Sequence, residues 1–92
     1  MYLEIVTPEA TLLAAEVDSV AVPGINGEFQ MLNNHAPIVS LLGKGAVKIY
    51  GNVELAKDVA NKFEKGANGE TLLSIDSGTI EMKDNKVIVL AD

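Results

Sequence analysis

The sequence contains no cysteine, no tryptophan and no arginine. Without cysteine, the chain has no disulfide bonds and no thiolate metal site, and its composition fits a reducing compartment. Without arginine, it has no planar side chain for two-point capture of phosphate or carboxylate. Two Phe and two Tyr are the whole aromatic supply. The core must therefore be built from Val, Ile, Leu, Ala and Met.

Positive charge is also scarce. Thirteen acidic residues outnumber seven lysines, which gives a formal net charge of −6. This charge repels nucleic-acid backbones and anionic lipid headgroups, so neither is an expected partner. No apolar run approaches the length of a membrane span, and the N-terminal residues lack the basic and apolar regions of a signal peptide. We expect no direct insertion into a membrane.

The dominant pattern is the alternation of apolar and polar residues that is typical of β-strands. The expected strands occupy residues 2–6, 16–22, 28–32, 38–42, 46–50, 72–75, 79–83 and 86–90. Turn residues separate them, notably at 23–27 and 84–85, where hairpins are expected. The run 38–42 is apolar apart from Ser40 and is predicted to be a strand buried on both faces. The sequence predicts one mostly β domain over 1–92, a two-layered β-sandwich or flattened barrel of about eight or more short strands.

The segment from Asn52 to Lys65 departs from this pattern. Its apolar residues recur at helical spacing, which predicts a short amphipathic helix near residues 53–65. Asn52 is the expected N-cap and Gly66 the expected left-handed residue after the helix. A long, irregular hairpin excursion is the alternative interpretation.

Catalytic and cofactor motifs are not present in the sequence. His35 is the single histidine, and no serine lies in a nucleophile-elbow sequence such as G-x-S-x-G. The preferred interpretation is that His35 makes a structural hydrogen bond with the backbone; a small hydrolase that uses His35 is a third and minor possibility. The carboxylates are dispersed, and no phosphate-binding loop or metal-ligand spacing occurs. We expect no catalytic, cofactor-binding or metal-binding residues.

The run from Val22 to Pro37 reads VPGINGEFQMLNNHAP. The order of its G-E and H-A-P motifs resembles the signature of the epsilon subunit of bacterial F-type ATP synthases. The opening residues Leu3 to Glu9, the stretch Glu16 to Val20 and the closing residues Gly78 to Asp92 also resemble that family, in the same order. The resemblance covers nearly the whole chain.

This resemblance implies a non-catalytic subunit of the central rotor stalk that couples proton-driven rotation to ATP synthesis. The implied partners are the gamma subunit, the ring of c subunits and, indirectly, the catalytic alpha/beta hexamer, at the cytoplasmic face of the bacterial plasma membrane. Carried over by motif, the expected c-ring side consists of Gly24, Asn26, Gly27, Glu28 and His35. For the gamma side, the candidates are Met31, Leu42 and Tyr50. For Glu28, the alternative interpretation is a solvated residue beside a turn. For Gly24 and Gly27, the alternative is a structural need for positive φ.

Two departures from the family limit the comparison. Many members continue into a two-helix C-terminal domain that restrains ATP hydrolysis and in some bacteria binds ATP, and we expect no such helical hairpin within residues 1–92. The second departure is the segment 52–65, where the family usually has plain strands. A free-standing β-sandwich module that binds a peptide or carbohydrate is the main alternative function, and it would require exposed aromatic side chains in a groove.

Overall fold

The computed structural model describes all residues from 1 to 92, and almost all of its regular structure is β-strand. The strands are β1 (Tyr2–Val6), β2 (Thr11–Glu16), β3 (Ser19–Gly24), β4 (Gly27–Met31), β5 (Ile38–Leu42), β6 (Gly45–Tyr50), β7 (Phe63–Lys65), β8 (Thr71–Ile75), β9 (Gly78–Lys83) and β10 (Lys86–Ala91). A three-residue 3₁₀ helix, η1 (Ala60–Lys62), precedes β7. No helix of the chain is long and apolar enough to span a bilayer.

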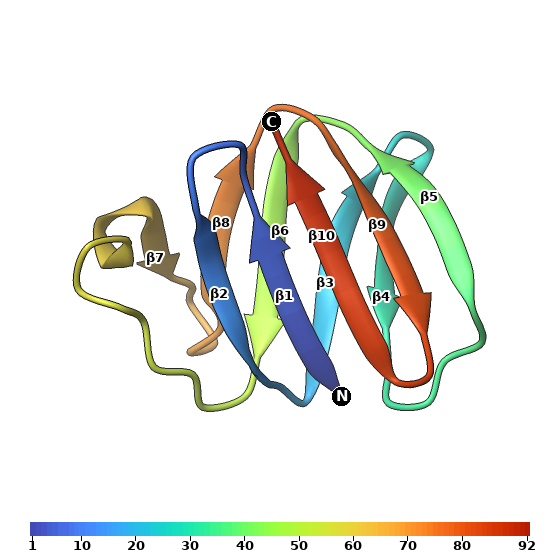
Figure 1. Ribbon diagram of the computed structural model, residues 1–92, viewed down its shortest axis with the longest axis horizontal. Coiled ribbons are helices and arrows are strands. Elements are labelled where there is room, and N and C mark those ends of the chain that lie inside the picture. The colour runs from blue at the N-terminus through green and yellow to red at the C-terminus, as the bar shows by residue number, and fades with distance from the viewer.

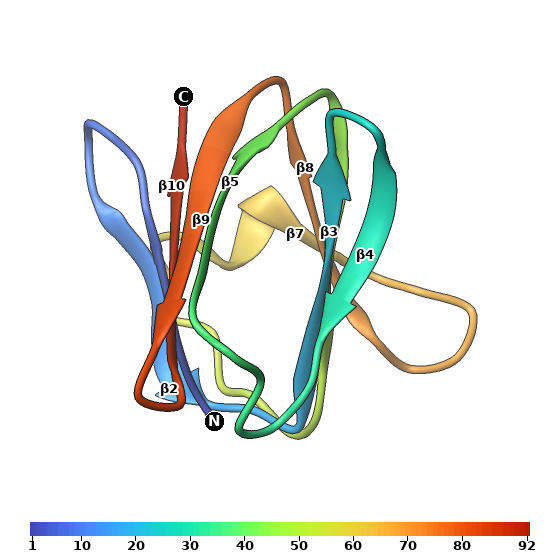
Figure 2. The same ribbon diagram turned by 90° about the vertical axis from the view of Figure 1, so that its right-hand side faces the viewer.

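The strands form two layers that face each other (Figures 1 and 2). The order along the sheet is β2-β1-β10-β9-β5-β3-β6-β8-β7, and β4 pairs with β3 beside this path. The sheet changes layer at β5, which pairs with β9 along its length but with β3 only through Leu42 and Gly24. The first layer therefore contains β2, β1, β10, β9 and β5, and the second contains β4, β3, β6, β8 and β7. This arrangement confirms the predicted β-sandwich.

The core lies between the layers and is aliphatic, as the shortage of aromatic residues required. The largest fully buried side chains are Leu3, Ile5, Val20, Val22, Met31, Val47, Ile49, Ile80, Met82, Val87 and Val89. Phe63 is the one buried aromatic residue. Each such side chain contributes about 1.5–3 kcal/mol when fully buried. The alternation seen in the sequence thus places every second residue of most strands between the layers.

The predicted helix near residues 53–65 is wrong. This region contains only η1 and β7, and the residues before them have no regular structure. Gly66 is not among the glycines with positive φ, so it does not end a helix in the expected way. The apolar side chains at helical spacing instead fill the far edge of the core: Val59 and Phe63 are buried, and Val53 and Leu55 pack against them. Figure 2 shows the segment between the two layers, closer to the alternative interpretation of an irregular excursion.

The strand β5 also differs from its prediction. Four of its five residues are apolar, yet Val39 is 74% exposed and Leu41 is 59% exposed, whereas Leu42 is buried. The reason is that β5 belongs to a single layer whose outer face meets solvent. One side of this apolar strand therefore lies on the surface.

Candidate partner-binding surfaces

The hairpin between β3 and β4 has a tight tip in which Ile25 and Asn26 form the turn. Gly24 and Gly27 are paired directly below it. A Cβ atom at Gly24 would lie 2.7 Å from the Gly27 carbonyl oxygen and from the Phe29 ring, and Gly27 has a φ of +124°. Both positions therefore require glycine for structural reasons. The result is a rigid tip that holds Ile25 62% exposed.

Glu28 follows this tip and forms an ion pair within the chain. Its carboxylate lies 2.9 Å from the Lys48 ammonium, on the outer face of the second layer. Because Glu28 is opposite Pro23 and Lys48 is opposite Ala21, the pair spans β3 and ties β4 to β6. The hydrogen bond and the charge of Glu28 raise the pKa of Lys48. The carboxylate is thus engaged and not free beside the turn.

His35 lies far from the hairpin tip, although the family signature suggested that it would be close. The strand β4 runs from the tip at Gly27 to Met31, a span of about 13 Å at roughly 3.3 Å per residue, and His35 follows its far end. The His35 Nδ1 atom lies 2.8 Å from the Ala36 carbonyl oxygen. This contact confirms a structural hydrogen bond with the backbone. A site that combines His35 with the tip is not formed.

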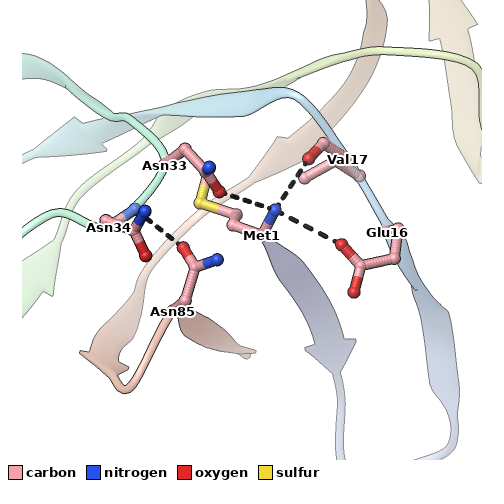
Figure 3. A network of polar contacts seen from close by, with 6 residues as sticks. All are labelled: Met1, Glu16, Val17, Asn33, Asn34 and Asn85. Atoms are coloured by element: carbon pink, nitrogen blue, oxygen red, sulfur yellow. Dashed lines mark hydrogen bonds and ion pairs between the residues drawn. The ribbon is translucent and has the colours of Figure 1, made fainter.

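The end of the molecule near His35 is held by a network of polar contacts around the first residue (Figure 3). The Met1 ammonium donates to the Val17 carbonyl oxygen at 3.2 Å and to Asn33 Oδ1 at 3.0 Å. It also lies 3.3 Å from the Glu16 carboxylate. These contacts connect β1 to the loops on either side of the β3–β4 hairpin, so this end is rigid.

The residues proposed for the gamma side are distributed differently from the prediction. Met31 is fully buried and Leu42 is 3% exposed, so both belong to the core and their prediction as surface contacts is wrong. Tyr50 is half-buried at the end of β6, and its carbonyl oxygen accepts a hydrogen bond from the Asp18 N–H. Of these three residues, only Tyr50 has a side chain that is partly open to solvent.

The outer face of the first layer carries the apolar surface that the sequence interpretation missed. Val39 and Leu41 lie on β5, and Leu90, 51% exposed, lies on β10. In the strand register Thr79 is opposite both Leu41 and Leu90, so these side chains follow one row across three strands. The largely apolar composition of β5 was the available signal. An apolar strand at the surface indicates contact with another molecule.

The outer face of the second layer has a different character. It carries the Glu28–Lys48 ion pair, and in the register Lys48 is opposite Leu72, which in turn is opposite Glu64. Of the exposed large apolar residues, none lies on β3, β4, β6, β7 or β8. No group of three or more His, Asp or Glu side chains is placed to hold a metal ion. The two faces therefore differ, and the apolar one is the candidate binding surface.

These features define a class of protein: a small β-sandwich whose surface suits protein partners, with one apolar sheet face and one rigid hairpin tip. The family follows from comparison with known proteins. A family model described as the ATP synthase, Delta/Epsilon chain, beta-sandwich domain matches residues 1–92. The chain belongs to this family.

Relatives with the name ATP synthase epsilon chain support the assignment. The chain is 40% identical over 90 residues to that of Leptospira borgpetersenii and 37% identical over 92 residues to that of Maridesulfovibrio salexigens. The alignments cover 98% and 100% of this chain, but 59% and 54% of the relatives. The chain thus spans less than two thirds of the length of these proteins.

Solved structures show the same fold. A chain in the central stalk/c-ring structure of the Tetrahymena thermophila mitochondrial ATP synthase aligns with a TM-score of 0.72 and 17% identity, covering 98% of this chain and 61% of that one. A chain of the Euglena gracilis mitochondrial ATP synthase aligns with the same TM-score and identity, covering 97% of this chain and 48% of that one. At this identity the similarity describes the fold alone.

Proposed function

We propose that this β-sandwich is the stalk-binding part of an F-type ATP synthase epsilon subunit. It binds the gamma subunit and the c-ring, contacts the alpha/beta hexamer only indirectly, and transmits rotation without a catalytic step of its own. It acts at the cytoplasmic face of the bacterial plasma membrane as a peripheral component. The observation that carries the proposal is the apolar outer face of the first layer, in a chain that matches the epsilon family along its whole length.

The apolar face on β5 and β10 is the proposed gamma-binding surface. A stable interface buries about 800 Å² on each partner, and the chain exposes 5433 Å² in total. One outer sheet face is therefore large enough. The centre of an interface is poor in charge and rich in apolar side chains, which the row of Leu41, Thr79 and Leu90 provides. Met31 and Leu42 are not part of this surface, because both are in the core.

The hairpin tip is the proposed c-ring contact. Ile25 and Asn26 project from a turn whose shape depends on Gly24 and Gly27. Glu28 acts here by holding the hairpin through Lys48. A rigid tip loses little conformational entropy when it binds, so it suits a contact that must carry force. His35 is outside this contact because it lies at the other end of β4.

The alternative of a peptide-binding or carbohydrate-binding module is not favoured. Such a site requires exposed aromatic side chains, whereas Phe63 is buried and Tyr2, Phe29 and Tyr50 are half-buried. The epsilon-chain relatives favour the stalk function instead.

Binding to the gamma subunit from the same organism tests the proposal. The unmodified chain is expected to co-elute with gamma as a one-to-one complex in size-exclusion chromatography. The double variant Val39→Ser, Leu41→Ser is expected to bind at least about tenfold more weakly, because contacts at the centre of an interface dominate its affinity. Leu32→Ser is the matched control, since Leu32 is 56% exposed but lies away from this face. Equal binding by all three proteins would contradict the proposed surface.

A further inference from the structure

The strand β4 has an open edge. It pairs with β3 on one side, and no strand pairs with it on the other side. In an antiparallel pair, successive residues direct their peptide groups alternately toward the partner strand and away from it. The register of β3 and β4 therefore decides which peptide groups of β4 meet solvent.

Pro23 fixes this register. Its carbonyl oxygen accepts a hydrogen bond from the Gly43 N–H, so the peptide groups of Pro23 point away from β4. Glu28 is opposite Pro23, and it must likewise direct its N–H and C=O away from β3. The same holds two residues later for Gln30, because its partner Ala21 pairs with Lys48 of β6 on the far side. Two donors and two acceptors, spaced by about 7 Å along the strand, are thus unpaired at this edge.

A hollow of about 300 Å³ adjoins this edge. It is lined by residues of the hairpin from Gly24 to Phe29 and by Ser40 of β5. Phe29 supplies an apolar wall and Ser40 a hydroxyl group. The neighbouring residues on β5 are Val39 and Leu41, the start of the apolar face. The hollow beside the open edge therefore reaches the strand that carries the start of the apolar face.

The usual protection of a sheet edge is weak in β4. Natural edge strands commonly carry a charge that prevents another strand from pairing. The charge available here is Glu28, and Lys48 already neutralises it at 2.9 Å. The edge consequently presents unpaired peptide groups beside apolar side chains without an uncompensated charge.

We infer that an extended segment of the gamma subunit adds to β4 as a further strand. Its peptide groups bond with those of Glu28 and Gln30, and one of its side chains enters the hollow against Phe29. This mode of recognition takes affinity from main-chain hydrogen bonds and specificity from pockets for alternate side chains. The inference rests on the proposed function, because the gamma subunit that binds Val39 and Leu41 is also the partner that reaches the open edge of β4.

Amide hydrogen exchange in the isotope-labelled chain, free and bound to gamma, tests the inference. In the free chain the amides of Glu28 and Gln30 are expected to exchange quickly and that of Phe29 slowly, because Phe29 bonds to β3. On binding gamma, Glu28 and Gln30 are expected to slow by at least about tenfold. A complex in which both amides keep their free rate would overturn the added strand while leaving the proposed function intact. Failure to form a complex would overturn both.

Amide exchange measured in the free chain at increasing concentration tests which molecule pairs with the edge of β4. Protection of Glu28 and Gln30 without gamma would identify a second copy of the chain at this edge and would overturn gamma as the occupant. A rate that does not depend on concentration is the expected result.

A matched pair of variants isolates the main-chain contact. Gln30→Pro removes an outward N–H, which an edge strand tolerates, and Gln30→Ala retains it. Both variants lose the hydrogen bond from the Gln30 side chain to Ser19, so they differ chiefly in the backbone donor. Gln30→Pro is expected to bind gamma about tenfold more weakly than Gln30→Ala, equivalent to one hydrogen bond. If both variants fold and bind gamma with equal affinity, the added strand is contradicted. If Gln30→Pro does not fold, the amide exchange measurement decides.

Discussion

Among single residues, Glu28 shows how the structure changes the meaning of a sequence motif. The family signature places Glu28 beside the hairpin tip, where an acidic group suggested a direct contact with the ring. The carboxylate instead pairs with Lys48 across β3, so its first effect is on the position of β4. Both side chains are partly exposed, and such pairs add little to stability. The ion pair therefore serves mainly to fix the position of β4 and to neutralise the charge of Glu28.

The first prediction concerns the pKa of Lys48. Replacement of Glu28 by Gln is expected to lower this pKa toward its ordinary value, because the charge and hydrogen bond that raise it are reduced. A group with a raised pKa in the folded state stabilises the fold below its unfolded pKa, and this contribution is lost as the pH rises through the folded value. The small benefit of the pair should therefore disappear only under strongly alkaline conditions.

Titration of Lys48 by NMR in the unmodified chain and in Glu28→Gln measures this shift. Glu70→Gln is the matched control, since Glu70 is the last of the groups that raise this pKa. A pKa that is the same in all three proteins would show that the ion pair is not formed in solution.

Among the structural elements, the segment from Val53 to Lys62 is the least regular, yet it closes the core. Its backbone hydrogen bonds are local: the N–H groups of Val59 and Ala60 both donate to the Ala56 carbonyl oxygen. Apolar burial, and not pairing with a strand, therefore holds it against the layers. Val59, at 5% exposure, is the residue through which it is fixed.

The second prediction is that Val59→Asp detaches this segment. A carboxylate at this buried position has no partner, and the free energy of unfolding is expected to fall by on the order of 3 kcal/mol. Asn61→Asp is the control, because Asn61 is exposed on the same segment and the change should be nearly neutral. Urea denaturation of the two variants compares these values. Equal stability would show that the segment does not close the core.

At the scale of the whole molecule, the two ends of the sandwich differ. One end carries the projecting tip at Ile25, and the other carries the Met1 network together with the exposed Leu32. The apolar face lies between these ends, on the outside of the first layer. A stalk subunit that joins gamma to the ring needs two such separate surfaces, one for each partner.

The third prediction concerns the tip. Ile25→Asp is expected to lower the number of protons pumped per ATP hydrolysed in a reconstituted synthase, because it places a charge on the exposed end of the hairpin. Leu32→Asp, at a similarly exposed position on the opposite end, should have no effect on this ratio. Loss of coupling with both variants, or with neither, would argue against the tip as the ring contact.

The sequence by itself determined the class of fold and many of its strands. Alternation with period two is a property of the strand, so the strands at 79–83 and 86–90 could be predicted without knowledge of their neighbours. Asp84 and Asn85 between them both adopt positive φ, at 53° and 61°, which is the turn expected for a two-residue hairpin. The shortage of aromatic residues, with no tryptophan, two Phe and two Tyr, likewise determined an aliphatic core.

Only the tertiary structure decided which faces of these strands are covered. Met31 and Leu42 are core residues, whereas Val39 and Leu41 are exposed, because period two describes alternation but does not say which side a second layer will cover. The segment before Phe63 has helical spacing, yet its side chains fill an edge formed by distant strands. The extended course of β4 placed His35 at the opposite end from the tip. The apolar face arises from the pairing of strands far apart in the chain, so local pattern could not locate it, whereas the hairpin tip is local and its turn could be predicted.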